Sequence, residues 1–512
     1  TSRIVYASYQ EEIMKLTKKI TSCILLAAMM TAITACDSED PIGSGNASAP
    51  TNGPSATTSA TTVVTTDPDE NAATDAGVKE IGTTAYTPDG NSGKIVWLGY
   101  YDLQTDGSAS EQYKIFTSEL YGGSIDYVQT TSGSAYFEKL ATMISSDDSP
   151  DIVRYEWRSF PTGMSKNMYE SLDNDIDLDD PLWSGMKDIA ENFTYKGVHY
   201  YYPYRITTNF ALNYNKKSIE EYALDDPYDL YMNNNWTWDT FKKLLIDWCN
   251  ADENHIGYAG EGGMSFIATT GTSLVKVQPD GSVKNNIGDV NVTRAMDFCA
   301  DLYRNGLTHQ GELGDWVSPQ LWADNSDRVL FLGMNPEWTY GAAAAQVQNK
   351  SGVEDDICNT VSDFAFVPFP RDPQSDEYSI AYDTFGYLVA KGAKNKKGAV
   401  DWINLNRVYE TDENIIANKK KEAVSPEPVY YTEGKYAGYQ KWALVWDEKQ
   451  YDLWQDMMDP TKFSFTFDDC WGFSDDLTTI CNKILFDPMF HGDSFTQLSQ
   501  EYSPVIDSII SQ

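Results

Sequence analysis

The pattern of apolar and polar positions predicts an alternation of strands and helices that begins near residue 93. Three short apolar runs, 94–99, 124–130 and 150–157, have the length and composition of buried strands. The segments 109–123 and 134–146 between them show helical spacing, with Tyr113, Phe116 and Leu120 on one face of the first. Crossovers this short predict parallel βαβ units in an open sheet, and hence an α/β fold.

In an open parallel sheet, ligands bind beyond the carboxyl ends of the strands. Tyr100, Tyr101 and Asp102 follow the first predicted strand. The third predicted strand ends in Tyr155-Glu156-Trp157-Arg158. From strand alternation we expect only one of Tyr155 and Trp157 to face a ligand.

The segment before this body has the pattern of an export signal. Lysines at 15, 18 and 19 precede an apolar run from Ile20 to Ala35, which is too short for a comfortable membrane span. The run ends in Ile33-Thr34-Ala35-Cys36, which resembles the lipobox of bacterial lipoproteins. We therefore expect residues 14–35 to be a lipoprotein signal peptide, and Cys36 to carry the lipid anchor.

Residues 1–13 and 36–92 lie on either side of this signal peptide. Gln10-Glu11-Glu12 can be encoded by a purine-rich run like a ribosome-binding site, so we interpret 1–13 as a gene-model artefact with translation starting at Met14. Residues 36–92 are rich in Ser, Thr, Ala, Gly, Asn, Pro and Asp and cannot bury enough apolar surface to fold. They are expected to form a disordered tether with a reach of roughly 40 Å.

Composition excludes several classes of function. The net charge of −38 disfavours nucleic acid as a partner, because nucleic acid is bound through Lys and Arg. Four scattered histidines, and cysteines without CxxC spacing, indicate neither a metal site nor a disulfide framework. No nucleotide-binding or hydrolase motif occurs, and we expect no cofactor. The 33 Tyr and 14 Trp favour sugar recognition, because aromatic faces offer flat apolar surface with polar edges.

The order of several segments resembles family 1 extracellular solute-binding proteins, the receptors of sugar ABC importers related to maltose-binding protein. The segments that carry the resemblance are "YFEKLATMISSDDSPDIVRYEW", "SLDNDIDLDDPLW", "YKGVHYYYPYRITTNFALNYNKKSIEEY", "NWTWDTFKKLL", "DRVLFLGMNPEWTYG" and "FAFVPFPRDPQSDEYSIAYDTFGYLVAKGAKNKKGAVDWINL". It covers nearly all of residues 93–512. The lipobox and tether fit the Gram-positive form of such receptors.

This resemblance implies a two-lobed, type II periplasmic-binding-protein-like fold with a hinge and a ligand cleft between the lobes. Residues 93–204 with about 383–430 would form lobe 1, and 205–382 with about 431–512 would form lobe 2. Hinge crossings are expected near 204–209, 367–383 and 425–435.

The resemblance also implies aromatic ligand contacts at Trp338, in "GMNPEWTYG", and at Trp471, in "DDCWGFSDD". For each aromatic candidate the alternative is a core position. Sugar hydroxyls also need polar partners when they leave water. The candidates for contacts with the ligand are Tyr101, Asp102, Tyr155, Glu156, Trp157, Arg158, Arg205, Asn209, Glu337, Trp338 and Trp471.

The sequence thus predicts a lipid-anchored, monomeric receptor that captures a carbohydrate, most simply an oligosaccharide, and delivers it to ABC permease subunits. It is expected to catalyse nothing. The alternatives are a secreted glycoside hydrolase with Glu156 and Glu337 as its paired carboxylates, and a surface adhesin for insoluble polysaccharide.

Overall fold

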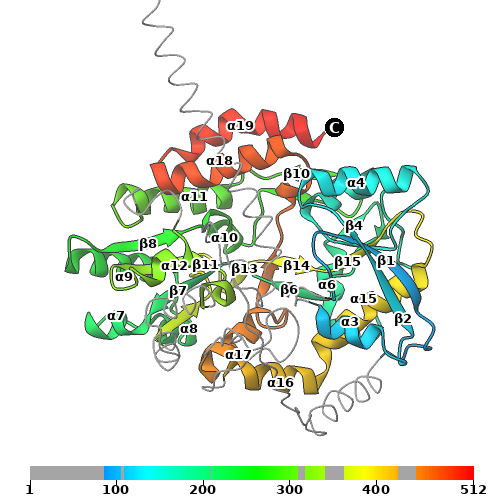
Figure 1. Ribbon diagram of the computed structural model, residues 1–512. Coiled ribbons are helices and arrows are strands. Elements are labelled where there is room, and N and C mark those ends of the chain that lie inside the picture. The colour runs from blue at the N-terminus through cyan, green and yellow to red at the C-terminus, as the bar shows by residue number, and fades with distance from the viewer. Residues whose placement is uncertain are drawn as a thin grey trace, which may run out of the picture.

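The computed structural model of the chain describes residues 86–104, 109–208, 210–309, 317–340, 363–424 and 446–511 (Figure 1). The predicted signal peptide, Cys36, the tether up to residue 85, Asn209 and most of the third predicted crossing lie outside the described residues.

The first sheet has the strand order β15-β3-β1-β2. β1 (Gly93–Gly99) lies parallel to both β2 (Gly123–Gln129) and β3 (Ile152–Arg154), while β15 (Tyr387–Val389) runs antiparallel to β3. α3 (Ser110–Phe116) and α4 (Ser134–Ser145) connect the parallel strands. The parallel βαβ units predicted from the hydrophobic pattern are therefore confirmed.

The predicted extent of the first helix was wrong, although Tyr113, Phe116 and Leu120 all pack on the first core as expected. α3 ends at Phe116, and its buried residues are Gln112, Ile115 and Phe116. Leu120 lies beyond it, in a turn that leads to Gly122 at φ +61°. A Cβ at Gly122 would lie 2.2 Å from the Gly90 carbonyl oxygen, so the chain must turn here and cannot continue the helix.

The second sheet has the order β12-β7-β11-β8. β11 (Val329–Met334) is parallel to β8 (Ile256–Gly260) and antiparallel to β7 (Ala211–Asn215), which pairs with β12 (Phe364–Val367). The helices of this part are α7 (Lys216–Glu221), α8 (Pro227–Met232), α9 (Trp238–Ala251), α10 (Gly263–Ala268), α11 (Val290–Arg304) and α12 (Pro319–Ala323). A capping box between Thr237 and Thr240 starts α9.

Shorter elements and the C-terminal helices complete the described chain. Between β3 and β6 lie η1 (Trp157–Ser159), α5 (Thr162–Ser165), η2 (Ser184–Met186), α6 (Lys187–Glu191), β4 (Thr194–Tyr195) and β5 (Val198–His199). A hairpin joins β9 (Val275–Val277) and β10 (Val283–Asn285). The later elements are α15 (Lys396–Thr411), α16 (Glu413–Ala423), α17 (Glu448–Met457), β16 (Ser464–Thr466), η3 (Asp469–Gly472), α18 (Asp475–His491) and α19 (Phe495–Ile510).

Two short strand pairs join the parts that contain these sheets. β6 (Arg205–Thr207) pairs antiparallel with β14 (Asp383–Phe385), and β13 (Ser379–Ala381) pairs parallel with β16. β6 and β14 fall at the first two expected crossings. Separate hydrophobic cores surround the two sheets, and Figure 1 shows β6, β13 and β14 between them. The exact lobe boundaries stay a prediction.

One close contact ties the C-terminal segment to the first part. A Cβ at Gly472 would lie 1.9 Å from the Phe160 carbonyl oxygen, so we expect Gly472→Ala to lower the free energy of unfolding by about 1–3 kcal/mol. Gly288 has open space around it and serves as the matched control, Gly288→Ala. Denaturant titration of both variants measures the effect, and equal stability of the two would contradict this packing.

Candidate functional site

A pocket of about 1080 Å³, counting the open space at its mouth, lies between the two cores. Its aromatic lining residues are Trp157, Phe210, Tyr382, Phe467, Trp471 and Phe486. Its acidic lining residues are Glu261, Asp383 and Asp468.

Two tryptophans form one wall of the pocket. Trp157 begins η1, which follows β3 after Tyr155 and Glu156, whereas Trp471 lies in η3, so the two come from distant parts of the chain. Their ring centroids are 5.8 Å apart at an interplanar angle of 31°, and both side chains are half-buried. They therefore present aromatic surface to whatever fills the pocket.

Local contacts hold the Trp157 ring and the backbone turn that carries Trp471. Trp157 Nε1 donates to Asp383 Oδ2 at 3.4 Å, which ties η1 to β14. Asp468 caps η3 by accepting from Cys470 N at 3.0 Å, and Thr162 Oγ1 donates to the Gly472 carbonyl oxygen at 2.7 Å. The aromatic wall is thus preorganised from both sides.

Glu261 differs from the other two pocket acids. It follows β8 directly, after Gly260 at φ +90°, where a Cβ would lie 2.6 Å from the Gly333 carbonyl oxygen. Its side chain is half-buried, and among the described residues no hydrogen bond or ion pair reaches its carboxylate. Burial raises the pKa of Glu261 to about 7.

The other two pocket acids have partners. Asp383 Oδ1 accepts from Thr384 N at 2.7 Å, besides the contact with Trp157. Asp468 accepts from the backbone N–H groups of Leu274 and Val275. Burial raises the pKa of Asp468, while these N–H groups oppose the rise.

Of the residues predicted at the end of the third strand, Trp157 lines the pocket and Tyr155 does not. Tyr155 is buried and stacks on Tyr201, with ring centroids 4.2 Å apart. Glu156 is also buried; it accepts a hydrogen bond from Tyr100 Oη at 3.0 Å and lies 3.9 Å from Arg154 Nε. Burial raises the pKa of Glu156.

Arg158, Arg205, Tyr101 and Asp102 also lie outside the lining of this pocket. Arg158 pairs with Asp475 at the start of α18. The Arg205 guanidinium carbon lies 4.3 Å from the centre of the Phe385 ring, within the β6–β14 pair. Trp97 Nε1 donates to the Tyr101 carbonyl oxygen at 3.0 Å, and Asp102 accepts from the backbone of Gln104 in a local turn.

Trp338 and Glu337 lie in a helical turn four and three residues after Met334, which does line the pocket. Asn335 Oδ1 accepts from Trp338 N at 3.0 Å and so caps this turn. Trp338 is half-buried and packs against a third hydrophobic core, which contains Trp322 and lies on the opposite face of the second sheet from the core that contains Phe331. Ligand contact by Trp338 and Glu337 stays a prediction.

Sequence analysis missed Glu261 and Asp383. A signal for Glu261 was present, because this acid directly follows the apolar run 256–260 and is flanked by glycines in "GEGG" (260–263), as in a turn at the end of a strand. Asp383 had no comparable signal, since its place depends on the pairing of β14 with β6.

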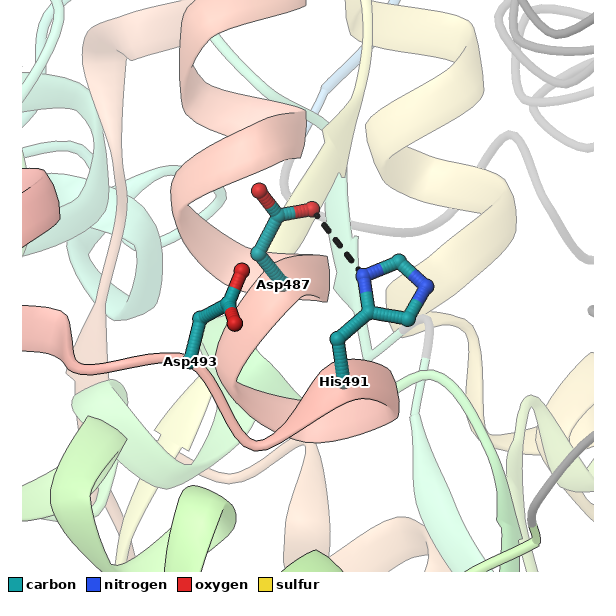
Figure 2. A group of neighbouring side chains, drawn as sticks. All are labelled: Asp487, His491 and Asp493. Carbon is teal, nitrogen blue, oxygen red and sulfur yellow. Dashed lines mark ion pairs between the residues drawn. The ribbon is translucent and has the colours of Figure 1, made fainter.

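Figure 2 shows the one group of described side chains whose donor atoms lie close enough together to hold a metal ion: Asp487, His491 and Asp493. Asp487 already pairs with Lys483, and its Oδ1 lies 3.4 Å from His491 Nδ1. His491 lies in the last turn of α18, and both His491 and Asp493 are exposed. Exposed acidic groups of this kind are common without a metal ion, so we assign no metal centre to the group.

Within the described residues, no helix is both long and apolar enough to cross a membrane.

A family model described as a bacterial extracellular solute-binding protein matches residues 111–416, and the chain belongs to this family. No curated protein sequence matches the chain. Among solved structures, the chain is similar to the sugar-binding protein MalE of Xanthomonas citri, with 13% identity, a TM-score of 0.58, and coverage of 82% of this chain and 97% of that one.

Two further structures share the fold. The GacH receptor of Streptomyces glaucescens, studied in complex with acarbose, is 14% identical with a TM-score of 0.54, over 82% of this chain and 99% of that one. An ABC substrate-binding protein of Listeria monocytogenes in complex with cycloalternan is 14% identical with a TM-score of 0.53, over 82% and 99% of the two chains. The predicted two-lobed, type II periplasmic-binding fold is confirmed.

The raised pKa of Glu261 predicts a pH dependence of stability. A carboxyl group with a folded-state pKa near 7 and an ordinary value of 4.5 stabilises the fold below pH 4.5, and this contribution is lost as the pH rises through 7. Glu261→Gln removes the ionisable group. We expect the free energy of unfolding of the wild type, relative to this variant, to fall by about 1–3 kcal/mol between pH 4.5 and 7.

Denaturant titrations of the ligand-free wild type and variant across this pH range measure the difference. If the difference in free energy of unfolding between the wild type and Glu261→Gln stayed constant across this pH range, the Glu261 carboxylate would be well solvated or paired.

Proposed function

We propose that this protein is the substrate-capturing receptor of a carbohydrate ABC importer. It binds a sugar, most simply an oligosaccharide, between its lobes and delivers it to the permease subunits. The observation that carries the proposal is the pocket wall formed by Trp157 and Trp471, in a chain that belongs to a family of extracellular solute-binding proteins.

The chemistry of this wall suits a sugar. The apolar C–H faces of a sugar ring pack on indole rings, while carboxylates nearby accept hydrogen bonds from hydroxyls. Asp383 and Glu261 supply such acceptors from two different elements. The GacH, MalE and cycloalternan-bound proteins are described by names or ligands of the same class, which supports the proposal without identifying the sugar.

The mechanism follows from where the lining residues originate. Trp157 extends from the first sheet, and Phe210 and Glu261 from the second, so one ligand between them would contact both lobes. A ligand that contacts both lobes favours the state in which they are closed over it. The permease would then recognise that closed state. Lobe 1 is proposed as residues 93–204 with about 383–430, and lobe 2 as 205–382 with about 431–512.

We further propose that the protein acts as a monomer, held at the extracellular face of a Gram-positive cell membrane by a lipid on Cys36. The basic and apolar segment at 14–35 supports this, as does the tether-like composition of 36–92.

The hydrolase alternative has less support. Its two acids, Glu156 and Glu337, do not line the pocket, and Glu156 is engaged by Tyr100 and Arg154. Incubation with oligosaccharides would separate the two functions, since a hydrolase releases reducing ends. If the protein were instead a surface adhesin, it would sediment together with insoluble polysaccharide. An adhesin would also function without a partner permease.

Trp157→Ala and Trp471→Ala test the aromatic wall. Each should weaken binding of the best oligosaccharide at least tenfold, because removal of a central aromatic anchor commonly costs about 2 kcal/mol or more. Calorimetric titration measures the affinity, and thermal melting of the ligand-free variants should change little. Trp338→Ala, run beside them, tests whether the site extends to Trp338.

The fully buried Trp402 provides a contrasting control. Trp402→Ala should lose about 3–5 kcal/mol of stability. A similar loss in Trp157→Ala or Trp471→Ala, or unchanged affinity in a stable variant, would refute the aromatic wall as the binding site.

Cys36→Ala tests the anchor. The variant should keep its folded body but leave the membrane fraction or remain an unprocessed precursor, whereas the wild type should carry lipid on Cys36. Cell fractionation and mass spectrometry provide the readout. Wild-type protein found wholly in the medium without lipid would contradict the anchor.

A further inference from the structure

The charged side chains that line the pocket all have the same sign. Glu261, Asp383 and Asp468 are acidic, and among the lining residues that the structure describes there is no lysine, arginine or histidine. An anionic sugar would meet like charges here without a counter-charge, and like charges at close range repel strongly in a poorly solvated site. The pocket thus disfavours uronic acids and phosphorylated sugars.

The pocket lining also contains acceptor atoms that have no hydrogen-bond donor from the protein. Glu261 has a carboxylate that no described residue contacts through a hydrogen bond or ion pair. Asn482 also lines the pocket, and its Oδ1 is buried without a hydrogen-bond partner. The Tyr382 hydroxyl, which also lines the pocket and is buried without a partner, can donate or accept. The Glu261 carboxylate and Asn482 Oδ1 can only accept, so the donors that complete these two groups must come from the ligand.

An ammonium group matches these features better than a hydroxyl. It carries donors and no acceptor, and its positive charge offsets the cost of burying the carboxylate. Cations are also attracted to the faces of aromatic rings, most strongly to tryptophan, and an aromatic cage with an acid is a recurring site for amines. Trp157 and Trp471 supply that surface in the same pocket as Glu261.

We propose that the pocket selects a carbohydrate that carries a protonated amine, and that Glu261 is the specificity-determining acid that pairs with it. This inference rests on the proposed function, because it specifies the class of sugar bound at the same site. Asp383 and Asp468 make the electrostatic potential of the pocket more negative. Both already accept hydrogen bonds from the protein, so Glu261 is the acid that makes the direct contact with the amine.

The test compares three oligosaccharides that share a β-1,4 linkage and length: glucosamine trimers, N-acetylglucosamine trimers and glucose trimers. Calorimetric titration of the full-length protein near neutral pH gives each affinity. The glucosamine trimer should bind at least tenfold more tightly than the glucose trimer, the order expected for one charge-assisted hydrogen bond. Acetylation removes the charge and should abolish this preference.

Glu261→Gln keeps the shape of the side chain and removes its charge. It should weaken glucosamine-trimer binding about tenfold to hundredfold and change glucose-trimer binding less than about threefold. Glu221→Gln is the matched control, because Glu221 is exposed at the end of α7 and the substitution changes net charge equally. A loss in both variants would mean that only the overall negative charge attracts the amine, and would overturn the role of Glu261.

The remaining outcomes separate this inference from the proposed function. Equal binding of amine and neutral trimers, unaffected by Glu261→Gln, would overturn the amine preference and leave a carbohydrate receptor. A fourth titration uses spermidine, an amine without a sugar. Binding of spermidine alone, lost in Glu261→Gln, would support the amine site and overturn the carbohydrate receptor. Absence of binding by all four probes would overturn the amine preference.

Discussion

The antiparallel pairing of β6 with β14 is the constraint on which the rest of the site depends. Thr207 pairs with Asp383 and Arg205 with Phe385, so two chain segments almost 180 residues apart are held in one register. Thr208 Oγ1 reinforces this junction by donating to the Ala381 carbonyl oxygen at 2.9 Å. Because a one-residue slip would turn each side chain to the opposite face, this pairing determines that Asp383 faces the pocket.

The pocket is therefore built from side chains that neither sheet could bring together alone. Trp157 is positioned by β3 and held by Asp383, while Trp471 arrives from the segment that follows β16. Glu261 is added from the end of β8. The site combines a preorganised aromatic wall with an acid whose burial is not compensated within the described protein, and an uncompensated buried charge is more often a functional feature than a stabilising one.

Local pattern was sufficient to predict the parallel strands and the strand-end position of Trp157. The core faces of α9 and α11 follow the same local rule, because buried positions such as Leu244 and Met296 recur at helical spacing. The expectation that only one of Tyr155 and Trp157 faces the pocket was right, but alternation is not the reason, because residues two apart point to the same face of a strand. β3 ends at Arg154 and Trp157 begins η1, so the two side chains do not belong to one strand and can differ in burial. The choice is made by Tyr201, which stacks on Tyr155 from a distant segment.

The roles of Glu156 and Asp383 could not be predicted from the sequence, because they depend on tertiary contacts. Glu156 has the chemistry of a ligand contact, but Arg154 and Tyr100 engage it within the first lobe. Asp383 becomes a pocket acid only through its partner strand. Pattern alone therefore predicts which edge of the sheet carries the site, and long-range pairing determines which side chains reach it.

A crystal structure of the protein with the tightest-binding carbohydrate from a calorimetric screen tests the central claim most directly. The account predicts one ligand between the lobes, in contact with Trp157, Trp471 and Glu261. A ligand bound elsewhere, or one that contacts a single lobe, would contradict it.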